Sequence, residues 1–200
     1  LRELGPTAAV CRGARQPSAL PTAARALDDA LPVPDGKGGT TTLADWQKAT
    51  YTDGLLVLHR GRVVYERHHS GMQPQQPHVL WSMSKSLTGL LATELIQEGV
   101  IDPKALIPRY LPELATSAWA DATVQQTLDM TTSVQYAENF ADPASGVFQY
   151  LAAAGLQPAP PGSNAAKSMA EFLPTLKKEG EHGTAFAYKS VDTEVLGWLL

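Results

Sequence analysis

The clearest alternation of apolar and polar residues lies between residues 54 and 68. Gly54 to His59 is a run of apolar, β-favouring residues, Arg62 to His68 alternates apolar with polar, and Arg60-Gly61 separates the two. Two such runs joined by a two-residue turn predict an antiparallel hairpin. Because the first run is apolar on both faces, we expect it to be an interior strand, whereas the second should have one face in water.

Helical patterns dominate the remaining sequence. The longest begins near Ser82 and should end at Gly99, because glycine favours the left-handed conformation that closes a helix. Residues 139–162 show neither the helical nor the strand period of apolar residues, which predicts a loop. Thr, Ser or Asp at the N-cap position and short apolar repeats predict further helices at 23–31, 42–49, 123–130, 168–178 and from Asp192 onward.

These elements divide the chain into three stretches. Residues 1–50 are rich in Ala, Pro and Gly and predict an N-terminal arm with short helices. Residues 51–79 predict the first strands of a sheet, and residues 80–200 a helical region. The expected fold class is therefore α+β, with an antiparallel sheet flanked by helices beside a mostly helical subdomain.

Composition favours a globular protein with a small-molecule partner. The 200 residues are 44% hydrophobic and 18% charged, which supplies enough apolar material for a core. The net charge is −4, and no basic stripe or basic amphipathic helix stands out. We therefore expect no nucleic-acid partner and no membrane partner, and no apolar run reaches the length of a membrane span.

The compartment is only weakly indicated. The single cysteine, Cys11, cannot form an internal disulfide, which is consistent with a reducing compartment and favours a cytoplasmic protein. The chain begins with Leu1 and not with Met, so a removed leader and a periplasmic or secreted destination stay open.

Four histidines near the predicted hairpin do not predict a metal site. Adjacent strand residues such as His68 and His69 point to opposite faces, and no carboxylate or cysteine stands at ligand spacing from them, from His59 or from His78. We expect these histidines to be solvated at a strand end.

The first candidate for chemistry is the Ser-x-x-Lys pair in Trp81-Ser82-Met83-Ser84-Lys85. Residues three apart on a helix share a face, so the amine of Lys85 can lie beside the hydroxyl of Ser82 and take its proton. However, 11 serines and 8 lysines give roughly 0.4 such pairs by chance. Taken alone, the pair fits better a helix with Ser82 as N-cap and Lys85 as a solvated charge.

The order of the motifs is more specific than any one of them. The hairpin, Ser-x-x-Lys, Glu-Gly-x-Ile-Asp-Pro at 98–103, Tyr-Leu-Pro-Glu-Leu at 110–114 and Tyr188-Lys189-Ser190 before a helix together resemble serine β-lactamases and penicillin-binding-protein-like hydrolases, in their class C and esterase branch. Within that branch the sequence looks most like 6-aminohexanoate-dimer hydrolases, which cleave linear nylon-oligomer amides and often short esters. The resemblance covers roughly residues 50–200.

The resemblance implies a role for three residues. Ser82 would be the acylated nucleophile, Lys85 its general base, and Tyr188 the phenol that relays the proton to the leaving amine. The implied activity is that of a serine hydrolase that forms an acyl-enzyme on linear amides or short esters. A carboxylesterase, a D-amino-acid peptidase or β-lactamase, and a non-catalytic penicillin-binding-type sensor module stay open as alternatives.

Further positions bear on the substrate. Ser190 stands where the family usually has an asparagine that positions the substrate carbonyl, which argues against efficient β-lactam hydrolysis and for the esterase or amidase branch. Tyr136 and Glu138 are additional candidates for contact with the substrate. The resemblance implies no metal and no organic cofactor.

The family also has a third motif, Lys-Thr-Gly or His-x-Gly, on later strands that supply the second N–H of the oxyanion hole. This sequence does not contain it. We therefore expect a C-terminal half of the fold, in the same or in another chain, to complete the enzyme, and a homodimer stays open.

Residues 1–200 alone should be poorly stable, because an apolar hairpin edge without a neighbouring strand favours association. Removal of one oxyanion-hole donor should also lower turnover by about two to three powers of ten. Analytical ultracentrifugation and turnover measurements on this chain test both expectations. A stable monomer with full turnover would show them to be wrong.

Overall fold

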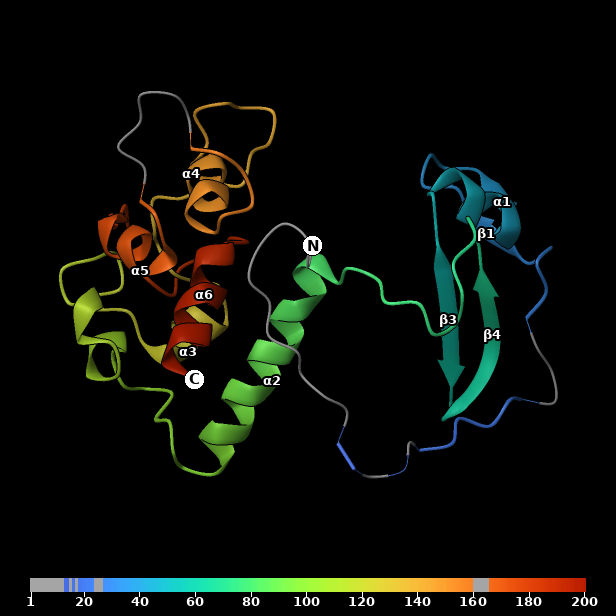
Figure 1. Ribbon diagram of the computed structural model, residues 1–200, viewed down its shortest axis with the longest axis horizontal. Coiled ribbons are helices and arrows are strands. Elements are labelled where there is room, and N and C mark those ends of the chain that lie inside the picture. The colour runs from blue at the N-terminus through green and yellow to red at the C-terminus, as the bar shows by residue number, and fades with distance from the viewer. Residues whose placement is uncertain (1–12, 15, 17, 24–26, 160–165) are drawn as a thin grey trace. The chain divides into compact units, whose positions relative to one another are not determined.

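The computed structural model describes residues 13–200 except 15, 17, 24–26 and 160–165. The described residues form two compact units that divide between Val79 and Leu80 (Figure 1). The N-terminal unit contains two small antiparallel sheets and one helix, and the C-terminal unit is helical.

The N-terminal unit is built from five short elements. Strand β1 (Pro32–Pro34) pairs with β2 (Thr40–Thr42), and α1 (Leu43–Ala49) follows directly. Strand β3 (Gly54–His59) then pairs with β4 (Arg62–His68). Each sheet has two strands, so sheet pairing in this unit is local in sequence.

The predicted hairpin is confirmed, and its turn has the expected geometry. Arg60 has φ 51° and Gly61 has φ 74°, both in the left-handed region. A two-residue turn with positive φ at both positions matches the right-handed twist of the strands that it joins. The dipeptide between the two β-rich runs therefore fixes where the chain reverses.

The position of β3 within its sheet differs from the prediction. Among the described residues β3 pairs only with β4, so it is not an interior strand here. Leu56 and Leu58 are accordingly 48% and 49% exposed. The other edge of β4 is partly covered, because the N–H of Val63 donates to the carbonyl of Pro21 at 2.9 Å.

Local capping explains the start of α1. The hydroxyl of Thr42 accepts a hydrogen bond from the N–H of Asp45 at 3.0 Å, as the sequence predicted. The helix predicted at 23–31 is wrong for the described positions 23 and 27–31, which carry a turn at Asp29-Ala30, and 24–26 lie outside the described residues. The following prolines enter β1 and do not continue a helix.

The C-terminal unit packs its helices around α6. Helices α2 and α3 each contact α6, and α4 contacts α5 (Figure 1). The α-helices are α2 (Ser84–Gln97), α3 (Val124–Leu128), α4 (Gly146–Ala153), α5 (Met169–Phe172) and α6 (Ser190–Leu199). The 3₁₀ turns are η1 (Trp81–Met83), η2 (Ile107–Arg109), η3 (Pro112–Leu114) and η4 (Leu173–Thr175).

One apolar core lies in this unit. Helix α6 contributes Val191, Val195 and Leu196, which follow the helical period and are at most 4% exposed. Trp119 is fully buried against them in the same cluster. Full burial of a valine or leucine side chain contributes about 1.5–3 kcal/mol, so this core holds α6 in place.

Helix α2 ends as predicted. Gly99 has φ 75°, its N–H donates to Ile96 at 3.1 Å, and the N–H of Val100 donates to Leu95 at 2.9 Å. This pair of bonds is the Schellman motif, which satisfies the last carbonyls of a helix. With 14 residues α2 is the longest described helix, and none of the helices in the described ranges is long and apolar enough to cross a bilayer.

Three other predictions in this unit are wrong. Helix α4 lies within 139–162, where a loop was expected. The helix that begins after Ser168 ends at Phe172 and not near residue 178, because Pro174 lacks an N–H and the chain turns into η4. Asp192 is not the N-cap of α6, since Lys189 occupies that position.

Asp192 is instead a buried acceptor. It is 0% exposed, and its carboxylate accepts hydrogen bonds from Trp119 Nε1 at 2.9 Å and from Thr132 Oγ1 at 2.7 Å. Burial raises the pKa of Asp192 to about 6, and the two hydrogen bonds only partly oppose that rise.

This pKa predicts a pH-dependent stability. Between its ordinary pKa of 3.8 and about 6, the folded protein holds a proton on Asp192 that the unfolded chain releases. The stabilisation is complete below 3.8, is lost as the pH rises through about 6, and amounts to about 3 kcal/mol. Urea unfolding at about pH 4 and about pH 7 should show this loss in the unsubstituted protein but not in Asp192→Asn.

Asp129→Asn, which alters an exposed carboxylate, is the matched control and should keep the loss. An equal change of stability with pH in Asp192→Asn and in the unsubstituted protein would contradict the prediction.

Candidate active site

Ser82 lies in the tight turn that leads into α2. Trp81, directly before it, has φ 46°, a left-handed conformation that costs a bulky residue about 1–3 kcal/mol. The hydroxyl of Ser84 donates to the carbonyl of Trp81 at 2.6 Å and so holds this turn. The candidate nucleophile therefore sits in a strained 3₁₀ turn, η1, immediately before the α-helix, and not within the helix itself.

The side chains of Lys85 and Tyr188 both reach the hydroxyl of Ser82. Lys85 Nζ lies 3.1 Å from Ser82 Oγ, and the hydroxyl of Tyr188 lies 2.6 Å from the same oxygen. Lys85 Nζ is also 5.2 Å from the centroid of the Tyr188 ring. The structure thus brings together the three residues that the sequence predicted to be catalytic, although Tyr188 is 106 residues away from Ser82.

The geometry suits proton transfer. Both the ammonium of Lys85 and the phenol of Tyr188 are placed to donate to Ser82 Oγ. A group within one hydrogen bond of a hydroxyl can remove its proton or return one, depending on its own protonation state. Ser82 therefore has a candidate base and a candidate acid at hydrogen-bonding distance.

Tyr188 is held by backbone hydrogen bonds to the loop after α3. The N–H of Ala187 donates to Met130 at 3.0 Å, and the N–H of Gly183 donates to Thr131 at 2.8 Å. Helix α6 begins two residues after Tyr188, so the packing of α6 in the core also restricts the tyrosine. Its position thus depends on contacts far from it in sequence.

Glu138 caps α6. Its Oε1 accepts a hydrogen bond from the N–H of Ser190, the first residue of α6, at 2.5 Å. A carboxylate at this end also interacts favourably with the helix dipole. This contact explains how α6 starts without a side-chain cap from Lys189.

The predicted substrate contacts of Tyr136, Glu138 and Ser190 stay predictions. Tyr136 and Ser190 are buried, with 7% and 5% of their surface exposed. The Tyr136 ring packs edge to face on Tyr150, with centroids 6.3 Å apart, and burial strongly raises the pKa of Tyr136. Its hydroxyl makes no hydrogen bond within the described part of the chain.

Apolar side chains are exposed near Ser82 in the sequence and near Tyr188. Trp81, Met83 and Phe186 are 68%, 69% and 67% exposed. Such residues offer contact surface for an apolar segment of a ligand.

Sequence reasoning missed the buried polar residues behind this site. Lys189 is 4% exposed, and its Nζ donates to the carbonyls of Thr132 and Val134. Asp192 carried a signal that could have revealed its role, because it lies on the same helical face as Val191 and Val195. A carboxylate on an apolar stripe indicates a buried, hydrogen-bonded charge.

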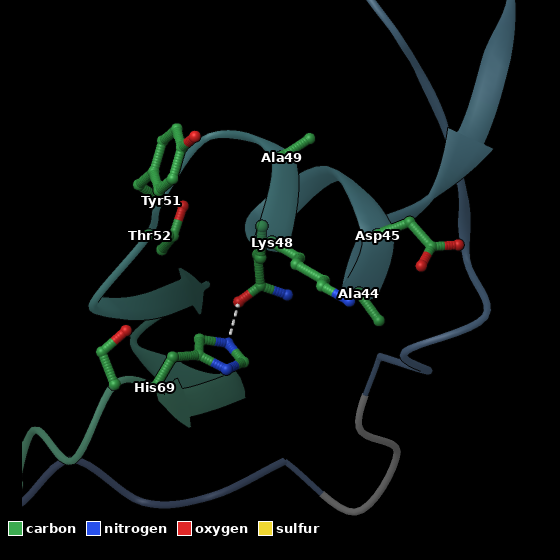
Figure 2. A pocket seen from close by; sticks show the side chains of 9 residues that line it. Ala44, Asp45, Lys48, Ala49, Tyr51, Thr52 and His69 are labelled. Atoms are coloured by element: carbon green, nitrogen blue, oxygen red, sulfur yellow. Dashed lines mark hydrogen bonds between the residues drawn. The ribbon is translucent and has the colours of Figure 1, made fainter.

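The N-terminal unit has a hollow of its own. Figure 2 shows it beside α1, with the hydrogen bond of 3.0 Å between His69 Nε2 and Gln47 Oε1. His78 Nε2 likewise lies 3.0 Å from Asp53 Oδ2, so these two histidines are hydrogen-bonded and not merely solvated. Within the described ranges no three His, Cys, Asp or Glu side chains are grouped so that they could hold a metal. The hollow is lined by Ala44, Asp45, Gln47, Lys48, Ala49, Tyr51, Thr52, His69 and Ser70.

Comparison with known proteins gives consistent matches. Residues 29–200 match the family model described as Beta-lactamase. The chain is 40% identical over 203 residues to a 6-aminohexanoate-dimer hydrolase from Paenarthrobacter ureafaciens, covering 100% of this chain and 48% of that protein. A solved structure from Bacillus anthracis, provisionally assigned as a 6-aminohexanoate-dimer hydrolase, superposes with a TM-score of 0.80 at 29% identity, over 91% of this chain and 47% of that one.

These matches confirm the fold predicted from the sequence. They also show that the chain spans about half the length of the relatives that it matches.

Proposed function

Because the chain belongs to the beta-lactamase family, we propose that it carries the nucleophile, base and proton relay of a serine hydrolase that acts on linear amides or short esters. One observation carries this proposal. A single oxygen, Ser82 Oγ, lies within hydrogen-bonding distance of two groups, the amine of Lys85 at 3.1 Å and the phenol of Tyr188 at 2.6 Å. A serine hydroxyl is a weak nucleophile until an adjacent group takes its proton, and this arrangement supplies such a group.

The reaction proceeds in two halves. Ser82 Oγ bonds to the substrate carbonyl carbon while its proton passes to the amine of Lys85. The tetrahedral intermediate then collapses, its C–N or C–O bond breaks, and Tyr188 donates a proton to the departing amine or alcohol. In the second half the deprotonated Tyr188 takes a proton from the attacking water, whose oxygen bonds to the acyl carbon, and Lys85 returns its proton to Ser82 Oγ as the bond between that oxygen and the acyl carbon breaks.

The start of α2 supports the developing negative charge. Ser82 precedes the first residue of this 14-residue helix by two positions. The N-terminal end of a helix carries a partial positive charge, and a backbone N–H of the nucleophile is a common oxyanion donor. An oxyanion formed on the substrate carbonyl next to Ser82 therefore meets a favourable potential.

Three observations favour linear substrates with an apolar segment. The relative that shares 40% identity with this chain is named for hydrolysis of 6-aminohexanoate dimer, a linear amide. The exposed side chains of Trp81, Met83 and Phe186 offer apolar contact for a methylene chain. Ser190, in place of the amide that the resemblance associates with β-lactam binding, points in the same direction.

A fluorophosphonate should form a covalent adduct at Ser82. Intact-mass spectrometry should detect the added mass in the unsubstituted protein and in Ser86→Ala, and should lose it in Ser82→Ala. Ser86 is a matched control because it is an exposed serine close to Ser82, on α2. Absence of any adduct, or an adduct that survives Ser82→Ala, would refute the proposed nucleophile.

Tyr188→Phe should slow acylation by a linear aminohexanoate dimer much more than acylation by p-nitrophenyl acetate. An amine must receive a proton as it leaves, whereas nitrophenolate leaves without one, so only acylation by the amide depends on the phenol as acid. Loss of a positioned acid lowers the rate by about 10²–10⁴-fold. Single-turnover kinetics on both substrates test this, because they measure acylation before the water step. Equal losses would assign Tyr188 another role, and turnover of the ester alone in the unsubstituted protein would favour a carboxylesterase.

A further inference from the structure

Lys189 follows the candidate proton relay, Tyr188, and is a buried lysine that has no role in the proposed reaction. It is 4% exposed, and its backbone is extended, with φ −143° and ψ 111°. Its Nζ donates to the carbonyl of Thr132 at 3.2 Å and to that of Val134, and lies 3.9 Å from Glu179 Oε1. Burial lowers the pKa of Lys189, while Asp192 and Glu179 oppose that change.

The two carbonyls that Lys189 binds belong to the loop that also holds the segment of Tyr188. Neighbouring backbone groups of this loop face residues 177–187: the N–H of Glu179 donates to Ser133 at 2.9 Å, and the N–H of Ala187 donates to Met130 at 3.0 Å. In the described part of the chain, the carbonyls of Thr132 and Val134 accept hydrogen bonds from the Lys189 ammonium and from no backbone N–H. The ammonium therefore satisfies groups that would otherwise be buried without a partner.

The extended backbone gives Lys189 and Tyr188 opposite directions. Successive side chains of an extended segment point to opposite sides. Lys189 accordingly extends into the buried side, whereas Tyr188 is 44% exposed and reaches Ser82 Oγ. We propose that Lys189 is a positioning residue, whose bonds to the carbonyls of Thr132 and Val134 hold the hydroxyl of Tyr188 within hydrogen-bonding distance of Ser82.

A second contact holds the same loop in place. The hydroxyl of Thr132 donates to Asp192 at 2.7 Å while its carbonyl accepts from Lys189. Thr132 is thus bound through both its side chain and its backbone by residues that flank the start of α6. A displacement of about 1 Å at a catalytic group can cost about 10²-fold in rate, so the two contacts of Thr132 affect the rate through the position of the Tyr188 hydroxyl.

The inference rests on the proposed function, because it assigns Tyr188 a role in the reaction.

Lys189→Met tests the proposal, because it removes the ammonium and keeps an unbranched side chain of similar length. Lys178→Met is the matched control. The backbone of Lys178 forms an isolated antiparallel β-bridge with Val134, so Lys178 lies beside the same loop. Its ammonium pairs with Asp121 at 2.6 Å and does not bind the carbonyls of Thr132 and Val134. We expect Lys189→Met to slow acylation by a linear aminohexanoate dimer at least tenfold and Lys178→Met to change it less than twofold, because departure of the amine needs the proton of Tyr188.

A double-mutant cycle separates positioning from general destabilisation. If Lys189 acts through Tyr188, Lys189→Met should slow acylation by the dimer little further once Tyr188→Phe is present. An equal tenfold loss in the Tyr188→Phe background would refute the proposal, because the lysine would then act independently of the phenol. Acylation of Lys189→Met by the dimer at the unsubstituted rate would refute it as well.

Fluorine NMR of protein labelled with fluorotyrosine gives a readout that needs no activity. Tyr188→Phe assigns the Tyr188 resonance among the 6 tyrosines. In Lys189→Met that resonance should move toward its position in the unfolded chain while the others stay, and an unchanged resonance would refute the positioning role. If the unsubstituted protein forms no adduct, the proposed function fails, and the NMR result still decides the placement of Tyr188. If all resonances collapse, Lys189→Gln, which keeps an amide donor, is measured by the same criteria.

Discussion

The hydrogen bond between the Tyr188 hydroxyl and Ser82 Oγ is the contact on which the candidate site depends. It joins two segments 106 residues apart, so neither a helix nor a turn can produce it locally. It requires that α2 and α6 pack together, and that the chain before α6 pairs with the loop after α3. The placement of Tyr188 is therefore a consequence of tertiary packing, whereas the bond between Lys85 and Ser82 is local, because it joins residues three apart where η1 meets α2.

Apolar packing and buried polar contacts contribute differently to this placement. Val191 and Val195 hold α6 against the core, but burial of apolar surface has little directionality. The hydrogen bonds of Lys189 and Asp192 to Thr132 have defined donors and acceptors, and each would leave a buried group unpaired if the register changed. We infer that the polar contacts select one arrangement among those that the apolar core would tolerate, even though burial raises the pKa of Asp192 to about 6.

Features determined by residues close together in the sequence could be predicted, and features determined by distant residues mostly could not. The hairpin turn at Arg60-Gly61 and the helix end at Gly99 were predicted correctly because each is determined by a few adjacent residues. Helix α4 was missed because it packs against α5, which is distant in sequence, whereas the burial of Asp192 was missed although its place on the face of Val191 and Val195 indicated it. The proximity of Tyr188 to Ser82 was expected only from a resemblance to a family, since no local pattern connects the two. The capping of α6 by Glu138 had no local signal either, because acceptor and donor are 52 residues apart.

The strained turn at Trp81 is a local interaction that positions Ser82, in contrast to the long-range contacts that position Tyr188. A left-handed tryptophan is unfavourable by itself, and the bond from Ser84 to its carbonyl offsets part of that cost. The turn directs Ser82 Oγ toward Lys85 on one side and Tyr188 on the other. The two sides of the hydrogen bond are thus held by different structures, a local turn for Ser82 and the packed core around α6 for Tyr188, and the proposed proton transfer requires both.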